Sequence, residues 1–273
     1  MKVLLIGHSG FIGQIILKYI LKKKLNLIIT KYNKVKIPKN EKIQKFDFKK
    51  DKKNIQKLSN LDLIIHSAWG SLDNYNSKNH LNKILNENLI FLKKLIYLGA
   101  KNIIILGTCF EYGLCNGEVN ENEVTKPTTS YGKAKKKLLL ELKSLQNKKK
   151  FNLSWARVFY IYGENQRKES LYSQIKISIK KGKKNFSLSN GNQKRDYLHV
   201  DVLAKKIVKL AFLKKNIGVV NVCSGKPVTI KNLVLKWKKK LKWNIKFNFG
   251  VKSIKKYEPN NFWGSIKKLN RLI

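Results

Sequence analysis

Tyr131 and Lys135 lie four residues apart in the stretch "PTTSYGKAK" (127–135), near the middle of the chain. Positions four apart share one face of a helix, so both side chains could point into one site. A free phenol has a pKa of about 10, and a neighbouring cation favours the phenolate, so the pair could act as a general acid/base. An ordinary helix start is the alternative, because lysine is so abundant here that chance will often place one after a tyrosine.

Thr108 is a further candidate, at the end of the apolar run "NIIILGT" (102–108). Buried strands are predicted at this run and at the apolar runs 2–7, 25–30, 61–68, 155–163 and 218–225. Stretches with helical spacing lie between them at 11–24 and 81–99. The alternation predicts an α/β fold, a Rossmann-like doubly wound parallel sheet. Ligands bind such sheets at the carboxyl ends of the strands, which is where Thr108 stands.

The 273 residues are enough for one large domain or for a domain with a smaller lobe. We expect residues 1–163 to form a dinucleotide-binding domain. Residues 164–273 should form mainly a substrate lobe, with 196–225 returning to the first domain. The segments 164–195 and 226–273 have an irregular pattern with several aromatic residues, and we expect them to fold over the carboxyl edge of the sheet.

Three glycines, Gly7, Gly10 and Gly13, separate the first predicted strand from the first predicted helix in "GHSGFIG". Glycine permits a tight turn, lets the backbone approach a pyrophosphate and lets helix and strand pack closely, while the helix N-terminus favours an anion. The spacing predicts a dinucleotide site, and a glycine-rich corner without a ligand is the alternative. Its first step is one residue longer than in the G-x-G-x-x-G of most dehydrogenases.

Six motifs make the chain resemble the extended short-chain dehydrogenase/reductase family, in particular its NAD-dependent epimerase/dehydratase group, which acts on nucleotide-activated sugars. Their order and spacing are also similar: "GHSGFIG" at 7–13, "DLIIHSAW" at 62–69, "GTCFEYG" at 107–113, "PTTSYGKAK" at 127–135, "RVFYIYG" at 157–163 and "RDYLHVDV" at 195–202. The resemblance covers nearly the whole chain. It implies that Thr108 hydrogen-bonds the reacting sugar oxygen, that Tyr131 transfers the proton, and that Lys135 also holds the nicotinamide ribose.

The resemblance assigns further cofactor contacts. They are Gly7, Gly10, Phe11, Ile12 and Gly13 in the turn, Asp47 and Phe48 beside the adenine, and Ser67 and Ala68 in a backbone turn near the cofactor. The acidic residue that normally follows the second strand is replaced by Thr30, Lys31 and Tyr32. Lys31 could meet a 2′-phosphate, so we expect NADP or NAD, with NADP favoured. The general abundance of lysine is the alternative explanation for Lys31.

Arg195 falls where the family contacts the diphosphate of the sugar nucleotide, a task that suits a bidentate guanidinium. A buried ion pair with Asp196 or Asp201 is the structural alternative. Tyr160, a second substrate-binding candidate, stands where a 4-epimerase usually carries an asparagine that grips the substrate.

The residues after Thr108 bear on the reaction. The family's 4,6-dehydratases carry an aspartate and a glutamate where this chain has Cys109 and Phe110, which argues against dehydration. Glu111 comes one residue later and would need a shifted loop to act. The motifs look more like the short 4-ketoreductases that make deoxysugar nucleotides for surface polysaccharides. We expect a 4-keto sugar-nucleotide reductase, with a 4-epimerase as the alternative and a non-catalytic or RNA-binding relative as a third hypothesis.

The formal net charge of +43 invites an interaction with nucleic acid. Only four of the 59 basic residues are arginine, however, and lysine is spread over every segment with abundant asparagine and isoleucine. A/T-rich codons explain that bias without any function. We therefore expect a nucleotide sugar, and not nucleic acid, as the partner.

The remaining features predict a cytoplasmic protein without a metal. No apolar run approaches the roughly 20 residues of a membrane span, and the three cysteines are scattered without metal-ligand spacing. The predicted helices at about 81–98 and 131–147 have apolar faces. Relatives often form homodimers through such helices, although the faces could simply pack on the sheet.

Overall fold

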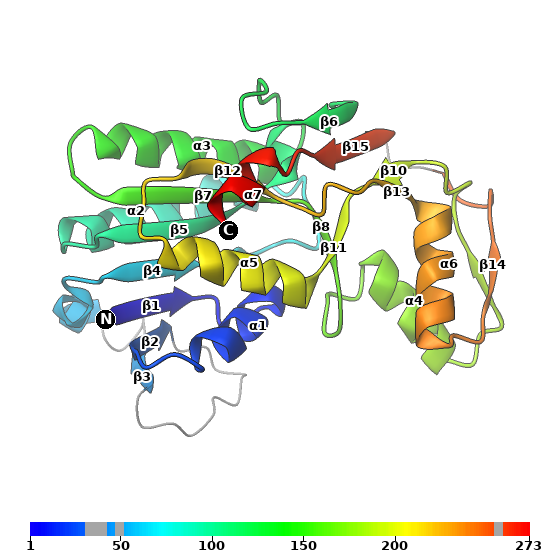
Figure 1. Ribbon diagram of the computed structural model, residues 1–273, viewed down its shortest axis with the longest axis horizontal. Helices are drawn as coiled ribbons and strands as arrows, with labels where there is room; N and C mark the ends of the chain where they lie inside the picture. Colours follow the sequence, from blue (N-terminus) through cyan, green and yellow to red (C-terminus); the bar gives the residue numbers. More distant parts are fainter. Residues whose placement is uncertain (31–42, 47–51, 254–258) are drawn as a thin grey trace.

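Seven parallel strands form the central sheet of the computed structural model, in the order β12-β7-β5-β4-β1-β2-β3 (Figure 1). The structure describes residues 1–30, 43–46, 52–253 and 259–273. The strands are β1 (Lys2–Ile6), β2 (Asn26–Thr30), β3 (Ile43–Phe46), β4 (Leu63–His66), β5 (Asn102–Thr108), β7 (Asn152–Val158) and β12 (Gly218–Val222). The order runs outward from β1 in both directions, so the predicted doubly wound α/β fold is confirmed.

Helices cover both faces of this sheet, and the inner strands are apolar on both sides. Val3 and Leu5 face one core, which also takes α1 (Phe11–Ile20), α5 (Val200–Phe212) and Leu269 of α7 (Lys267–Leu272). Leu4 and Ile6 face the other, with α2 (Leu85–Tyr97), α3 (Ser130–Gln146) and the short helix η1 (Lys52–Leu58). A π-helical turn, η2 (His80–Ile84), runs directly into α2.

The apolar run 155–163 was expected to be one strand, and the structure divides it in two. β7 ends at Val158, and β8 (Tyr160–Tyr162) leaves the sheet to pair in parallel with β11 (Tyr197–His199). The aromatic side chains of β8 explain the departure, since Tyr162 packs 4.9 Å from Trp237 and Tyr160 packs 5.4 Å from Tyr197 (ring centroids). The second half of the run therefore belongs to the lobe.

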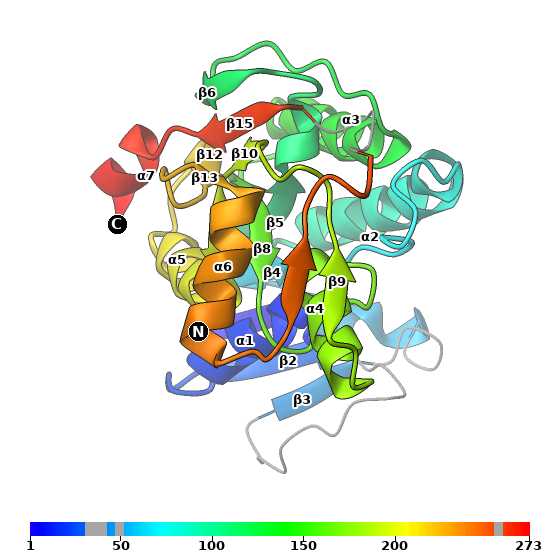
Figure 2. The same cartoon turned by 90° about the vertical axis from the view of Figure 1, so that its right-hand side faces the viewer.

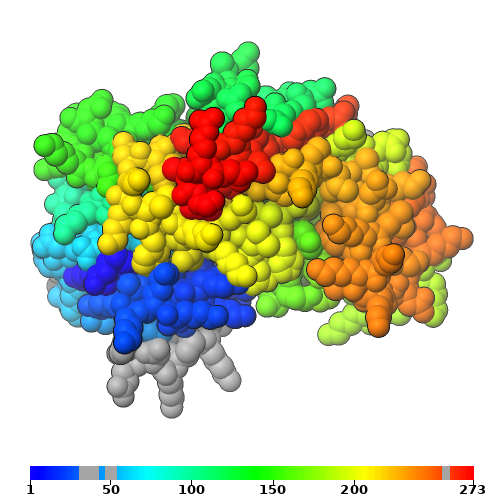
Figure 3. Space-filling model, viewed as in Figure 1, coloured from blue at the N-terminus to red at the C-terminus, as the bar shows by residue number. Residues whose placement is uncertain are grey.

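The segments 164–195 and 226–273 are more regular than expected. They contain two amphipathic helices, α4 (Leu171–Lys180) and α6 (Ile230–Leu241), and the paired strands β9 (Asn185–Ser187) and β14 (Lys246–Asn248). Tyr172, Ile175, Val234 and Trp237 are among the residues of a separate apolar core between these elements. This lobe projects from one end of the body, as the orange α6 surface in Figure 3 shows.

A four-stranded sheet, in the order β13-β10-β15-β6, connects the lobe to the main domain (Figure 2). Its strands are β6 (Gly117–Val119), β10 (Lys194–Arg195), β13 (Val228–Thr229) and β15 (Asn261–Gly264). β15 pairs in parallel with both β10 and β6, and Phe262 of β15 packs 5.2 Å from Phe159 at the end of β7. No helix in the described part of the chain is long and apolar enough to cross a membrane.

Candidate active site

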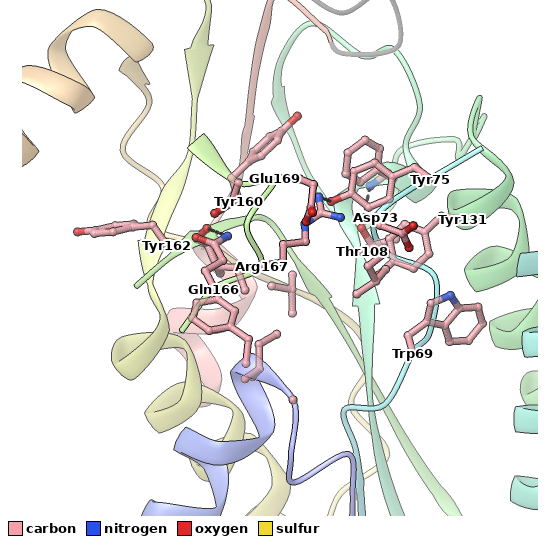
Figure 4. Close-up of a pocket in the computed structure, with 18 of the residues that line it drawn as sticks. Trp69, Asp73, Tyr75, Thr108, Tyr131, Tyr160, Tyr162, Gln166, Arg167 and Glu169 are labelled. Carbon is pink, nitrogen blue, oxygen red and sulfur yellow. Dashed lines mark hydrogen bonds between the residues drawn. The ribbon is translucent and has the colours of Figure 1, made fainter. Parts of the chain in front are cut away.

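A cavity of about 1210 Å³ lies where the carboxyl ends of β1, β4, β5 and β7 face the lobe (Figure 4). The sheet side contributes the glycine turn, Thr108, Tyr131 and Lys135 to its lining. The lobe side contributes β8, Arg167, the start of α4 and Arg195. This is the position at which open α/β sheets bind their ligands.

The glycine turn forms a cradle at one end of the cavity. Gly7 has φ +87°, and a Cβ added at Gly13 would lie 1.9 Å from the Gly7 carbonyl oxygen, so neither position accepts a side chain. Gly10 precedes α1 without a capping side chain, and no acidic residue stands in the first turn of that helix. The free N–H groups and the helix dipole suit a pyrophosphate, and Phe11 and Ile12 line the cavity beside them. These residues fit a dinucleotide.

Ser67 and Ala68 lie directly under this turn. The Ser67 hydroxyl donates to the Ile6 carbonyl oxygen (2.9 Å), and a Cβ at Gly7 would come within 2.6 Å of the Ala68 nitrogen. Both residues line the cavity. The other predicted cofactor contacts, Lys31, Asp47 and Phe48, lie outside the described residues.

Thr108 ends β5 and opens the short helix η3 (Cys109–Glu111). Its hydroxyl accepts from the Phe110 N–H (3.3 Å), and its own N–H donates to Glu111 Oε1 (2.9 Å), a reciprocal capping box. Gly107 makes room for this arrangement, because a Cβ there would lie 2.7 Å from Glu111 Oε1. The backbone of Thr108 is therefore fixed by a buried carboxylate.

Glu111 is completely buried, and its oxygens are fully engaged. Besides the Thr108 N–H, they accept from Trp155 Nε1 (2.9 and 3.1 Å) and from Arg157 Nε (2.9 Å). The Arg157 side chain is 5% exposed and forms an ion pair with the carboxylate. No shifted loop brings Glu111 into the cavity as an acid, because the carboxylate is held on the far side of Thr108 by β7.

Tyr131 lies beside Thr108 at the start of α3. Thr129 caps that helix by accepting from the Gly132 N–H (3.1 Å), and the Tyr131 N–H donates to the Tyr75 carbonyl oxygen (2.9 Å). The Thr108 and Tyr131 side chains both line the cavity and lie beside each other (Figure 4). Burial raises the pKa of Tyr131 well above its ordinary value, and the nearby Thr108 hydroxyl opposes that rise.

The ammonium of Lys135 lies below this pair and is 2% exposed as a residue. Its Nζ donates to the Leu106 carbonyl oxygen (2.8 Å) and lies 4.0 Å from the centre of the Trp69 ring. Burial lowers the pKa of Lys135 to about 7, against a weaker opposing effect of Glu111. We expected the lysine to favour the Tyr131 phenolate, but burial dominates both groups and favours their neutral forms.

Arg195 and Tyr160 approach the cavity from the lobe. The guanidinium of Arg195 lies 5.6 Å from the Tyr160 ring centre, and Nη1 donates to the carbonyl oxygens of Lys194 (3.0 Å) and Asn260 (2.8 Å). The Asp196 carboxylate accepts from two backbone N–H groups at 2.7 and 2.8 Å, those of Ser224 and Gly225. Arg195 therefore supports the backbone of the lobe and also lines the cavity.

Trp69, Tyr75 and Arg167 are among the cavity residues that were not predicted. Arg167 Nη2 donates to the Tyr75 hydroxyl (2.5 Å), its guanidinium lies 4.7 Å from the Tyr75 ring centre, and that ring stacks on Tyr131 at 5.4 Å. Figure 4 shows Tyr75 and Tyr131 on one wall, with Arg167 reaching toward them. The rarity of arginine in this chain was the available signal, since Arg167 is one of four.

A family model and curated relatives match most of the chain. The model of the "NAD dependent epimerase/dehydratase family" matches residues 3–223. A dTDP-6-deoxy-L-talose 4-dehydrogenase (NAD(+)) from Aggregatibacter actinomycetemcomitans is 26% identical over 97% of this chain and 100% of its own length. A dTDP-4-dehydro-6-deoxyglucose reductase from Escherichia coli is 23% identical over 85% of this chain and 79% of its own.

Solved structures share the fold. A UDP-N-acetylglucosamine 4-epimerase from Methanobrevibacter ruminantium M1, in complex with UDP-N-acetylmuramic acid, superposes with a TM-score of 0.86 at 22% identity, over 99% of this chain and 91% of its own. A UDP-glucuronic acid 4-epimerase from Bacillus cereus, in complex with UDP-glucuronic acid and NAD, superposes with a TM-score of 0.82 at 21% identity, over 100% of this chain and 92% of its own. The chain belongs to the NAD-dependent epimerase/dehydratase family, the extended short-chain dehydrogenases/reductases that act on nucleotide sugars.

Proposed function

We propose that this protein reduces the C4 ketone of a 4-keto-(deoxy)sugar nucleotide, using a nicotinamide dinucleotide. The proposal depends on the placement of Thr108 and Tyr131 beside each other on the cavity wall, with the buried Lys135 in the same lining (Figure 4). A hydroxyl pair of this kind can bind one carbonyl oxygen from two sides and deliver a proton to it.

The residues would divide the work as follows. The glycine turn, Ser67 and Ala68 hold the dinucleotide, which supplies the hydride when bound. Thr108 donates a hydrogen bond to the ketone oxygen and orients it. Tyr131 gives its proton to that oxygen as the carbon is reduced, and its raised pKa suits a group that must hold the proton until then. Lys135, when charged, stabilises the phenolate that this transfer leaves.

The surroundings of Thr108 favour reduction over dehydration. Cys109 is 3% exposed in an apolar cluster, and burial raises the pKa of its thiol. Phe110 has no ionisable group, and the Glu111 carboxylate is paired with Arg157. Removal of water from the sugar would need an acid and a base in the cavity, and these three side chains supply neither.

The names of the dehydrogenase and the reductase relatives support a choice of substrate class. Both are named for dTDP-linked 6-deoxy sugars, one for oxidation at C4 and the other for reduction of the 4-keto group, which are opposite directions of the same type of reaction. A dTDP-4-keto-6-deoxyhexose is therefore the first substrate to test, in keeping with a role in making deoxysugars for surface polysaccharides. Arg195 and Tyr160 would hold the diphosphate end, where a guanidinium gives bidentate contacts.

The choice of cofactor is also a prediction. The expectation of NADP depended on Lys31, which lies outside the described residues, and the comparisons do not support it. The dehydrogenase relative is named for NAD(+), so we now expect NADH to serve at least as well as NADPH.

Absorbance of the reduced cofactor tests the proposal. The purified protein is mixed with NADH or NADPH and a panel of dTDP- and UDP-linked 4-keto-6-deoxy sugars, and cofactor loss is compared with product formed. Stoichiometric oxidation with one ketone would support the reductase. Interconversion of two sugar nucleotides without net cofactor loss would instead support a 4-epimerase. No turnover, with RNA bound in the preparation, would overturn both.

We also propose that the protein is a homodimer. α2 and α3 lie side by side on one face of the sheet and leave Ile90, Tyr97 and Leu140 57%, 59% and 54% exposed. Sedimentation of the wild type and of an Ile90→Glu/Leu140→Glu variant would test this, and an unchanged mass would place the contact elsewhere.

A further inference from the structure

Trp69 stands between two parts of the site, the backbone turn at Ser67–Ala68 and the catalytic lysine. Its ring centre is 4.0 Å from Lys135 Nζ and 6.0 Å from the Tyr131 ring centre. Figure 4 shows its indole on the same wall as Tyr131. Trp69 is the last residue of the motif "DLIIHSAW" (62–69).

His80 fixes the direction of this indole. Trp69 Nε1 lies 3.1 Å from His80 Nδ1, and the two rings are stacked with 20° between their planes. An indole nitrogen can only donate, so Nδ1 must accept and the imidazole proton must be on Nε2. His80 Nε2 lies 2.9 Å from the Asn74 carbonyl oxygen, which accepts that proton. Both ring nitrogens are therefore used, and the imidazole is held neutral.

The location of His80 supports a role at the site. It is completely buried, its ring centre is 5.4 Å from that of Tyr131, and it begins the π-helical turn η2. Single π-helical turns are rare and are often found at functional sites. Here the turn places the imidazole within hydrogen-bond distance of the indole and 5.4 Å from the Tyr131 ring centre.

Lys135 needs such support because water cannot solvate it. Its ammonium donates to the Leu106 carbonyl oxygen, and the centre of a second aromatic ring, that of Trp155, lies 5.9 Å from Nζ. Indole is the best aromatic partner for a cation, and the attraction grows when the cation is desolvated. Without the ring face, burial alone would favour the neutral amine.

We propose that Trp69, oriented by His80, is a positioning residue that holds the Lys135 ammonium by its ring face and keeps it cationic beside Tyr131. The inference deepens the proposed function, since it assigns the support of a predicted catalytic lysine. It can nevertheless be tested on the ligand-free protein, so its outcome is independent of whether any sugar is turned over.

The other ionisable groups around the ammonium are Glu111, Tyr131, His66 and His80. Glu111 is ion-paired with Arg157 and raises the pKa of Lys135. Burial lowers the pKa of His66 to about 3, lowers that of His80 and raises that of Tyr131, so these three are neutral near pH 7. A change in the Lys135 titration on altering Trp69 therefore reports the indole.

The test uses NMR of protein with ¹³C-labelled lysine. The Lys135 Cε methylene is identified as the signal absent from a Lys135→Met variant, and its ring-current shift and titration midpoint are measured. Replacing tryptophan by mono- and difluorotryptophan weakens the ring face without changing its size. We expect the midpoint to fall by roughly a few tenths of a pH unit per fluorine, and this dependence to be greatly reduced in Trp69→Phe.

Two controls make the result specific. Lys23 lies 4.6 Å from the Phe212 ring centre on the surface, so its signal should not respond to fluorotryptophan. For His80, asparagine keeps an acceptor near the Nδ1 position and leucine does not. His80→Asn should retain the upfield shift of Lys135 and His80→Leu should lose most of it. A midpoint insensitive to fluorination, or equal wild-type shifts in both His80 variants, would overturn the proposal.

Discussion

Replacing Lys135 with methionine should make the protein more stable at the same time as it ends catalysis. The side chain is 2% exposed, and burial lowers its pKa from 10.5 to about 7. Folding must therefore either bury a charge or release a proton. Methionine has a similar length, needs no solvation and would remove that cost.

The magnitude follows from linkage between protonation and folding. Because the folded-state pKa lies below the unfolded one, the unfolded chain binds more protons between pH 7 and pH 10.5, so wild-type stability rises with pH in that window. The cost is about 4 kcal/mol at pH 7, about 2 kcal/mol at pH 9 and close to zero above pH 10.5. Leaving the Leu106 carbonyl without its donor would offset about 1 kcal/mol of the gain.

Urea denaturation of the wild type and of Lys135→Met at pH 7 and pH 9 measures this directly. Lys133→Met is the matched control, since Lys133 is exposed on the same helix and its loss should change the free energy of unfolding by less than about 0.5 kcal/mol. We expect Lys135→Met to be more stable by about 3 kcal/mol at pH 7 and by much less at pH 9. A destabilised variant, or a gain that is equal at both pH values, would refute the reasoning.

Four further predictions concern other parts of the site. Tyr131→Phe should lower turnover by about 100-fold or more while cofactor affinity, measured by fluorescence titration, stays nearly unchanged; surviving turnover would contradict the assignment. Gly13→Ala should lower the melting temperature, because its Cβ would clash with backbone at 1.9 Å, whereas Gly10→Ala, with a contact of 3.4 Å, should fold and lose only dinucleotide affinity. Glu111→Gln should cost about 3 kcal/mol or more in urea unfolding, since it leaves a buried guanidinium without its counter-ion; an unaffected fold would show that the pair is dispensable. Arg195→Lys should raise KM for the sugar nucleotide with little change in kcat, and an unchanged KM would leave the residue a purely structural role.

Much of the main sheet could be predicted from the sequence because its strands are buried on both faces. Such strands appear as short continuous apolar runs, and β1, β2, β4, β5 and β12 all begin within two residues of their predicted starts. The division of 155–163 into β7 and β8 could not be predicted in this way. It depends on partners such as Trp237, which lie about 80 residues further along the chain.

The helices of the lobe were missed for a different reason. α4 carries Leu171, Ile175 and Ile179 at helical spacing, but lysines and serines between them dilute the pattern. The placement of Thr108 next to Tyr131 could be predicted from the sequence, because strand ends and helix starts meet at one edge of the sheet. The ion pair of Glu111 could not be predicted, because its partner Arg157 is on another strand, 46 residues further along the chain.

The positions of the arginines indicate the candidate site better than the net charge does. Of the four in the chain, Arg167 and Arg195 line the cavity and Arg157 holds the carboxylate behind Thr108. Each makes contacts that use the planar fork or the flat face of a guanidinium. Where lysine fills 55 of 59 basic positions, the exceptions point to sites with strict geometry.

The sheet formed by β6, β15, β10 and β13 has a consequence for which substrates fit. β15 pairs on one side with β6, which follows Thr108 by nine residues, and on the other with β10, which carries Arg195. Main-chain hydrogen bonds through β15 therefore join the segment that follows Thr108 to the strand that carries Arg195. If Arg195 binds the diphosphate as proposed, this connection should hold the diphosphate at a fixed distance from Thr108, and substrates with a different distance between the phosphates and the reacting carbon should react more slowly.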